Sequence, residues 1–264
     1  MAEAHSPLLL RSEVADGVGV LTLTDPQKRN ALSAAMLQQL QAKLAEFAAQ
    51  QVRVVILCDD PGARVFSAGH DIHELRTDRD PLAYDEPLEK ALRAVRSYPG
   101  PVIAMVHGSV WGAAFDLICS CDILIADDES EFAITPANLG LPYNTPGLLH
   151  FLSRLPINLI KEMMFTAAPI PAQQAKDWHI VNHLVPAPEL RDFTINFARN
   201  ITMKAPLSIA AVKEQLRVLT DDHAVSAQAA DRIAALRRTV WESRDMKEGI
   251  AAFFEKRKPA FQGR

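Results

Sequence analysis

Two loops in this sequence have the composition of an anion-binding backbone. Residues 65–75, Val-Phe-Ser-Ala-Gly-His-Asp-Ile-His-Glu-Leu, follow an apolar run and enter a short helix near Asp71. Residues 108–115, Gly-Ser-Val-Trp-Gly-Ala-Ala-Phe, follow a second apolar run in the same way. Backbone N–H groups at a helix start lack partners within the helix, and small residues let them approach a ligand closely. Either loop alone also suits an ordinary capping turn, but two amides converging on one carbonyl oxygen would form an oxyanion hole.

Other side chains that often carry chemistry are arranged less suggestively. The three cysteines, Cys58, Cys119 and Cys121, lie in or beside apolar segments. Their position predicts buried, inert thiols and fits a reducing compartment such as the cytoplasm. No group of His, Cys and Asp residues has the spacing of metal ligands, so we expect no metal.

The composition narrows the classes of partner. The 264 residues carry a formal net charge of −4 with a pI of about 6.1, whereas nucleic-acid-binding domains are usually basic. The two longest stretches without formal charge, residues 97–115 and 132–153, are interrupted by proline and glycine. They predict turns and short elements rather than a membrane helix. We therefore expect neither a nucleic acid nor a membrane as partner.

The elements that must position the two loops alternate between strand and helix. Apolar, β-branched runs predict strands, at residues 17–24, 52–57, 102–106 and 123–126. Apolar spacing of three and four residues predicts helices, at residues 33–50 with Ser33 as N-cap, 84–97 and 112–119. This alternation indicates βαβ units, and therefore an α/β fold with a mostly parallel sheet.

The character of the chain changes from about Leu148. Helical patterns dominate to the end, apart from a short strand predicted near residues 181–185. A stripe at helical spacing predicts packing in the core or between subunits; it consists of Val225, Ala229, Ile233, Leu236 and Val240. We interpret residues 1–200 as the core and residues 201–264 as a C-terminal helical region.

Four segments together resemble the crotonase superfamily, also called the enoyl-CoA hydratase/isomerase family. They read Lys-Arg-Asn-Ala-Leu at 28–32, Phe-Ser-Ala-Gly-His-Asp at 66–71, Gly-Ser-Val-Trp-Gly-Ala-Ala at 108–114 and Cys-Asp-Ile at 121–123. The resemblance implies a spiral of ββα units with a C-terminal helical region for oligomerisation and coenzyme A contact. It also implies an acyl-CoA thioester as substrate, coenzyme A bound only as part of that substrate, no permanently bound cofactor, and a homotrimer or homohexamer.

The resemblance assigns roles to individual residues. The backbone N–H groups of His70 and Ala113 would form the oxyanion hole, Ala113 at a position where the family usually has glycine. Coenzyme A contacts would come from Arg29, Ala31, Ala68, Gly69 and Ile72, and from Phe253 and Lys256 of a neighbouring subunit.

The expected reaction follows from two further positions. Family hydratases resemble one another in having two glutamates for general acid–base work, and these positions fall on Asp116 and on Pro136, which cannot transfer a proton. An oxyanion hole without a base suits decarboxylation of a malonyl-type thioester, which forms an enolate without proton abstraction.

A finer resemblance supports that reaction. Asp80-Pro81-Leu82 and residues 138–144, Asn-Leu-Gly-Leu-Pro-Tyr-Asn, are similar to the superfamily members that decarboxylate methylmalonyl-CoA to propionyl-CoA. This similarity implies that Tyr143 orients the substrate carboxylate.

Two other functions stay open at this point. One is an enoyl-CoA hydratase or isomerase that uses Asp116 alone, and the other is a catalytically silent acyl-CoA-binding subunit. Single residues also have plain structural interpretations: Asp116 as a helix cap, Tyr143 in a surface turn, and the His70 side chain as packing only. We expect His73 and Glu74 to lie on the exposed side of a helical turn.

Overall fold

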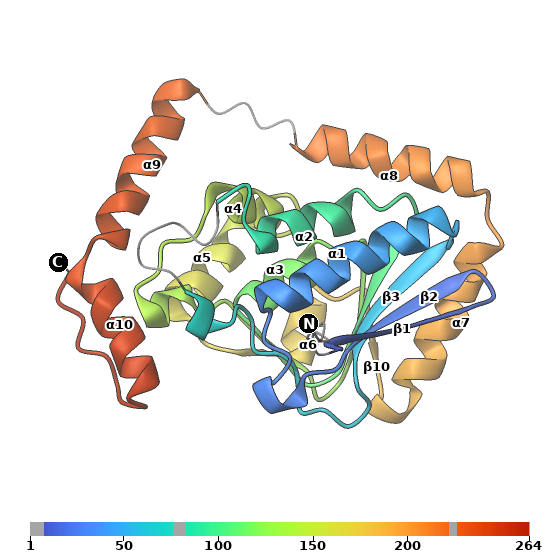
Figure 1. Cartoon of the computed structure of the whole chain (residues 1–264), viewed down its shortest axis with the longest axis horizontal. Coiled ribbons are helices and arrows are strands. Elements are labelled where there is room, and N and C mark those ends of the chain that lie inside the picture. Colours follow the sequence, from blue (N-terminus) through green and yellow to red (C-terminus); the bar gives the residue numbers. More distant parts are fainter. Residues whose placement is uncertain (1–7, 76–82, 222–225, 264) are drawn as a thin grey trace, which may run out of the picture.

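The centre of the protein is a six-stranded sheet (Figure 1), seen in a computed structural model that describes residues 8–75, 83–221 and 226–263. The strand order is β1-β2-β3-β5-β7-β10. The strands are β1 (Leu10–Ala15), β2 (Val18–Leu23), β3 (Val54–Asp59), β5 (Val102–Val106), β7 (Ile123–Asp127) and β10 (His183–Val185). Only the β1–β2 pair is antiparallel, so the sheet is mostly parallel as predicted.

A second, smaller sheet has the order β4-β6-β8-β9. Its strands are β4 (Val65–Ser67), β6 (Ser109–Trp111), β8 (Glu131–Ala133) and β9 (Ile170–Pro171). The first three each follow a strand of the large sheet directly, and they pair in parallel. The chain therefore steps from the large sheet to the small one three times, which is the α/β spiral that the resemblance implied.

Helices cover both faces of the large sheet (Figure 1). On one face lie α1 (Ala34–Ala49) and α2 (Pro87–Arg96), and on the other lies α7 (Leu190–Thr202). The Ser33 hydroxyl accepts a hydrogen bond from the Met36 N–H at 3.3 Å, which confirms the predicted N-cap. Helix α2 begins three residues later than predicted, with Pro87 in the first turn, where its missing N–H costs no hydrogen bond.

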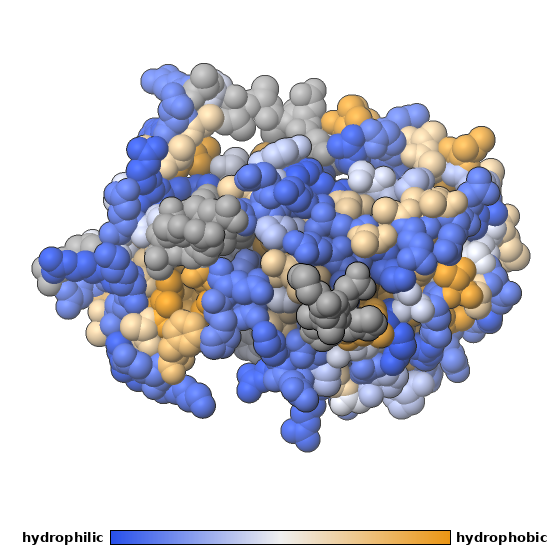
Figure 2. All heavy atoms as spheres, viewed as in Figure 1, coloured by the Kyte–Doolittle hydropathy of each residue, from blue (hydrophilic) through white to orange (hydrophobic). Residues whose placement is uncertain are grey.

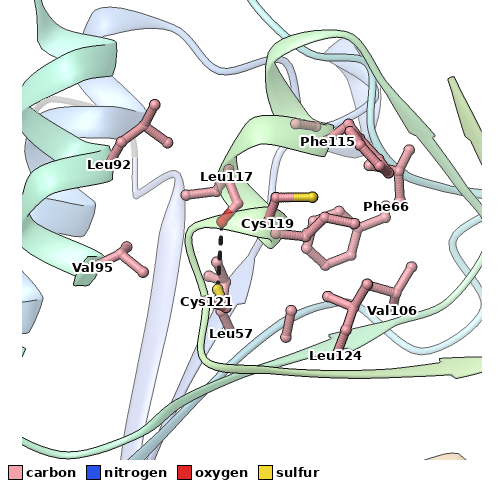
Figure 3. Packing of buried hydrophobic residues seen from close by; sticks show 14 of the residues in the cluster. Leu57, Phe66, Leu92, Val95, Val106, Phe115, Leu117, Cys119, Cys121 and Leu124 are labelled. Carbon is pink, nitrogen blue, oxygen red and sulfur yellow. Dashed lines mark hydrogen bonds between the residues drawn. The ribbon is translucent and has the colours of Figure 1, made fainter. Parts of the chain in front are cut away.

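Cys119 and Cys121 lie in the larger apolar core (Figure 3), and Cys58 lies in the smaller core on the other face of the large sheet. All three thiols are free and buried. Burial raises the pKa of Cys58 to about 11 and that of Cys119 to about 12. The expectation of buried thiols is confirmed, and their thiolate forms are suppressed at neutral pH.

The remaining helices lie between and after the strands of the small sheet in the chain. They are α3 (Ala113–Cys119), α4 (Thr145–Leu152), α5 (Ile157–Thr166), α6 (Ala172–Asp177), α8 (Pro206–Asp221), α9 (Ala227–Trp241) and α10 (Arg244–Phe254). Short 3-10 turns include η1 (Pro26–Lys28), η2 (Ile72–Glu74), η3 (Pro136–Leu139) and η4 (Ala187–Glu189). Within the described residues, no helix has both the length and the apolar character needed to cross a membrane.

The last helices expose apolar side chains. On α8, Leu207 is 84% exposed and Leu219 is 75% exposed, and Figure 2 shows apolar atoms along this helix. On α9, Leu236 of the predicted stripe is 59% exposed, while Val225 lies outside the described residues. The described part of the stripe therefore does not enter the core of its own chain.

Candidate active site

A cleft brings several of the predicted site residues together. His70, Ala113 and Tyr143 all line it. Its other described lining residues are Ala68, Ile72, Leu75, Gly112, Thr135, Pro136, Leu139, Leu141, Pro142 and Trp241. A mostly apolar concave site with few polar groups is typical of small-molecule binding.

The loop at residues 65–75, which forms one part of the cleft, is held by hydrogen bonds to the segment before α1. The Leu32 N–H donates to the Gly69 carbonyl at 2.7 Å, and the Ala68 N–H donates to the Arg29 carbonyl at 2.9 Å. The buried Asn30 side chain adds a bond from its Nδ2 to the Phe66 carbonyl at 3.0 Å. Residues 28–32 therefore hold the loop in place by hydrogen bonds, which explains why the segments 28–32 and 66–71 occur together in the sequence.

The two loops meet at Gly69. Its φ is +83°, and a Cβ placed on it would lie 3.2 Å from the Ala113 backbone nitrogen. The residue that follows, His70, therefore carries its amide into the neighbourhood of the Ala113 amide. Within the described part of the chain, neither N–H donates a hydrogen bond to a protein acceptor. By contrast, the Gly112 N–H donates a hydrogen bond to the Ala133 carbonyl at 2.9 Å. Two unpaired amides beside one cleft are the donors that an oxyanion hole requires.

Tyr143 lines another part of the cleft wall, and its hydroxyl donates a hydrogen bond to Asp116 Oδ2 at 3.0 Å. The other carboxylate oxygen of Asp116 contacts His150 Nδ1 at 2.9 Å. Burial, followed by the nearby Asp116 charge, holds the pKa of Tyr143 well above its usual value. Tyr143 is therefore a neutral phenol in a buried hydrogen-bond chain and not a free surface side chain.

Asp116 lies behind the cleft wall. It is only 1% exposed, and both of its oxygens have partners. It does not cap a helix, because it lies within α3, whose N-cap is Gly112. Its burial and two partners leave it withdrawn from a ligand, in contrast to a carboxylate that takes a proton directly from substrate.

The second carboxylate position of the hydratases is occupied by Pro136, which opens η3 and lines the cleft. Among the described lining residues there is no aspartate, glutamate, lysine or arginine, and the ionisable ones are His70 and Tyr143. The His70 side chain is half-buried, with Nδ1 at 3.0 Å from the Asp71 carbonyl. His73 and Glu74 are exposed as predicted, and Glu74 accepts a hydrogen bond from the first N–H of α1 at 2.7 Å.

The residues expected to contact coenzyme A are distributed unevenly. Ala68 and Ile72 line the cleft, Gly69 and Ala31 are buried beside it, and Arg29 is exposed. Phe253 and Lys256 lie at the end of α10 and beyond it, exposed to solvent and outside the described wall of the cleft. Among the residues that the structure describes, no group of three or more His, Cys, Asp or Glu could hold a metal ion.

Sequence reasoning missed two residues of this site. Trp241 reaches the cleft from the end of α9, and His150 reaches Asp116 from α4. Neither lies in a motif that marked the other site residues. Helix α10 supports this end of the cleft by packing on η3, where a Cβ on Gly249 would lie 2.4 Å from the Leu139 carbonyl oxygen.

Comparison with known proteins identifies the family to which this chain belongs. The family model for enoyl-CoA hydratase/isomerase matches residues 13–264. The methylmalonyl-CoA decarboxylase of Escherichia coli (strain K12) is 46% identical over 247 residues, which cover 93% of this chain and 95% of that protein. The human mitochondrial enoyl-CoA hydratase domain-containing protein 3 is 38% identical over 255 residues, covering 93% of this chain and 81% of that protein.

Solved structures agree with these relationships. A methylmalonyl-CoA decarboxylase in complex with 2-nitronate-propionyl-CoA superposes with a TM-score of 0.95 at 44% identity, covering 97% of this chain and 99% of that one. A second structure, complexed with 2S-carboxypropyl-CoA, has a TM-score of 0.96 at 44% identity and covers 98% and 100% of the two chains.

Proposed function

The chain belongs to the enoyl-CoA hydratase/isomerase family, and on this premise we propose that it decarboxylates methylmalonyl-CoA to propionyl-CoA. The observation that carries the proposal is a cleft with two unpaired amides and no acid–base carboxylate on its described wall. Such a cleft can stabilise an enolate, but it offers nothing to abstract a proton at one carbon and deliver water at another. The 46% identity to a methylmalonyl-CoA decarboxylase supports the same reaction.

In the proposed mechanism, the thioester oxygen accepts hydrogen bonds from the N–H groups of His70 and Ala113. Tyr143 faces the substrate carboxylate and fixes its angle to the thioester plane. The bond between Cα and the carboxylate breaks, CO2 leaves, and the electron pair of that bond enters the enolate. The amides stabilise the charge that develops on the thioester oxygen. A proton from water then adds to Cα and completes propionyl-CoA.

Coenzyme A is part of the substrate in this proposal and not a resident group. Ala68 and Ile72 line the cleft, Gly69 follows Ala68 directly, and the Arg29 carbonyl accepts a hydrogen bond from the Ala68 N–H. We assign these four residues, together with Ala31, to the coenzyme. Phe253 and Lys256 point to a different arrangement, because both are exposed and lie away from the described cleft wall of their own chain. We propose that they contact the coenzyme of a neighbouring subunit.

That arrangement requires a homo-oligomer, which we propose to be a trimer or a hexamer. The exposed apolar side chains of α8 and α9 support it, because extended apolar surface usually marks a contact site. In this assignment residues 1–200 form the catalytic core. Residues 201–264 form the region that joins subunits and completes the coenzyme site.

Hydration through Asp116 alone is disfavoured by the position of Asp116, which is buried and has two partners. One assay panel tests the proposal. Purified protein should release CO2 from methylmalonyl-CoA, and the ethyl and unsubstituted malonyl thioesters define how tightly the α-substituent is selected. If CO2 is released from none of the three, the decarboxylase assignment is wrong, and the hydratase and silent-binder alternatives return.

A further inference from the structure

The hydrogen-bond chain behind Tyr143 has a direction. Tyr143 has one phenolic proton, and it is donated to Asp116 Oδ2, away from the cleft. When a malonyl-type substrate binds, its carboxylate competes with Asp116 for that single proton. A phenol that already serves an anion is a weaker donor to a second anion, so the substrate carboxylate is held less firmly than by a free hydroxyl.

Tyr143 and His150 contact different oxygens of Asp116. His150 Nδ1 lies 2.9 Å from Oδ1, so it leaves the bond from the Tyr143 hydroxyl to Oδ2 in place. A second buried acid, Glu89 of α2, accepts a hydrogen bond from Asn144, and burial raises the pKa of Glu89. The guanidinium of Arg93 on the same helix donates to the Tyr84 carbonyl and stacks 3.7 Å over the Tyr84 ring, and its positive charge also acts on Glu89.

The described cleft wall contains no lysine or arginine that would offset a second negative charge near Tyr143. The amides of His70 and Ala113, in contrast, offer positive dipoles at the place of the thioester oxygen. The cleft is therefore electrostatically uneven. Negative charge is disfavoured near Tyr143 and favoured at the amides.

Decarboxylation moves charge in the direction that this arrangement favours. The substrate carboxylate leaves as neutral CO2, and its electron pair becomes the enolate charge at the thioester oxygen. Given the decarboxylation proposed above, we propose that Asp116 is a positioning residue that acts through Tyr143 to destabilise the substrate carboxylate in the ground state. The interaction is unfavourable before the bond breaks and is relieved as CO2 forms, so it raises kcat at the expense of substrate affinity.

The test compares two substitutions at Asp116 that separate charge from shape. Asp116→Asn removes the charge and keeps the size, while Asp116→Glu keeps the charge. With methylmalonyl-CoA, Asp116→Asn should lower both kcat and KM, each by at least roughly tenfold, because a unit charge a few ångströms from the substrate carboxylate contributes more than a tenfold factor even at an effective dielectric constant of about 20. Asp116→Glu should stay closer to the wild type in both constants.

Binding of two ligands provides a second readout. 2S-carboxypropyl-CoA carries the carboxylate but has no thioester carbonyl, and propionyl-CoA carries the carbonyl but no carboxylate. Asp116→Asn should bind the first roughly tenfold more tightly than the wild type does and the second with unchanged affinity. Asp60→Asn is a control for loss of one negative charge, because Asp60 pairs with Arg11 on the surface, and it should change neither affinity.

Thermal unfolding of each variant shows whether it folds. If Asp116→Glu does not fold, the changes in kcat and KM of Asp116→Asn test the inference without it. Unchanged constants in Asp116→Asn would overturn the inference. So would a raised KM with weaker 2S-carboxypropyl-CoA binding, because Asp116 would then help to hold the carboxylate. Absence of CO2 release by the wild type is a different result and refutes the proposed function itself.

Discussion

A Cβ atom on Gly69 would lie 2.4 Å from the carbonyl oxygen of Trp111, a separation that real side chains do not adopt. The backbone of residues 65–75 thus passes directly against the backbone of residues 108–115. The glycine is required twice, because its φ of +83° is also one that L residues rarely adopt. This contact fixes the distance between the amides of His70 and Ala113.

Gly69→Ala is expected to separate the two loops and abolish most of the activity. Loss of one oxyanion donor typically costs roughly 100- to 1,000-fold in kcat, so CO2 release should fall by at least that factor. Gly62→Ala is the matched control, because Gly62 has a φ of +88° and no atom within 4 Å of the added Cβ. Gly62→Ala should lower the free energy of unfolding by about 1 kcal/mol, because alanine is strained at a positive φ, and it should keep its activity. Equal activity in both variants would contradict the contact.

Tyr143→Phe removes only the hydroxyl and keeps the ring. It should lower the rate of CO2 release from methylmalonyl-CoA markedly, while affinity for propionyl-CoA, which has no carboxylate, stays nearly constant. Tyr84→Phe is a suitable control, because Tyr84 is 71% exposed. A wild-type decarboxylation rate in Tyr143→Phe would show that the assigned role of this hydroxyl is wrong.

Hydratase activity should be negligible. A positioned general acid or base contributes roughly 100- to 10,000-fold, and Pro136 supplies none. Loss of the enoyl absorbance of crotonyl-CoA should therefore proceed at less than roughly a hundredth of the rate of a family hydratase that has both glutamates. Pro136→Glu should restore no more than a trace, since the proline opens η3 and its removal changes that turn. Rapid consumption of crotonyl-CoA by the wild type would refute this interpretation.

Sedimentation should show a trimer or a hexamer. Leu219→Asp, which places a charge on the exposed apolar face of α8, should shift the protein toward smaller species. Val14→Asp, at a 47% exposed position of the edge strand β1, should leave the assembly intact. A monomer with full affinity for coenzyme A would exclude the proposed contribution of Phe253 and Lys256 from a neighbouring subunit.

The buried Asp59 should make stability depend on pH. Burial raises the pKa of Asp59 to about 7, and its Oδ2 has no partner among the described residues. The native state therefore binds this proton more tightly than the unfolded state, and the free energy of unfolding falls as pH rises from about 4 to about 7.

Asp59→Asn cannot ionise and should remove that fall, leaving the variant roughly 1–3 kcal/mol more stable than the wild type at pH 8. Denaturant unfolding at pH 5 and pH 8 measures the difference. The control variant is Asp60→Asn, because the neighbouring Asp60 pairs with Arg11 on the surface. Its free energy of unfolding should change little at either pH. A pH dependence that persists in Asp59→Asn would assign the effect to another group.

Much of the large sheet and of the site could be predicted from the sequence, because the signals are local. Ser33 and the apolar spacing after it define α1 with its cap, and β-branched runs define β3 and β5. Glycine at 69 and 112, each placed after a strand, marks the two loops of the proposed oxyanion hole. These signals depend on neighbours a few residues away.

The parts that could not be predicted depend on distant packing. Strands β4, β6 and β8 have three residues each, too few to show a period of two. In strand β1, at the edge of the sheet, the first residue is buried and the other five are wholly or partly exposed, so its apolar signal is weak. His150 lies 34 residues from its partner Asp116, and only the packing of α4 on α3 brings them together.

The tryptophans of the cleft have a practical consequence. The chain has three tryptophans, and two of them adjoin the proposed acyl site: Trp241 lines the cleft, and Trp111 directly precedes the Gly112–Ala113 corner. The third, Trp178, lies at the end of α6 and packs against the core. Indole emission depends on the polarity of its surroundings, so a thioester that displaces water from the cleft changes the fluorescence of the unlabelled protein. The site carries its own optical reporter, and Trp178 supplies a signal from outside it.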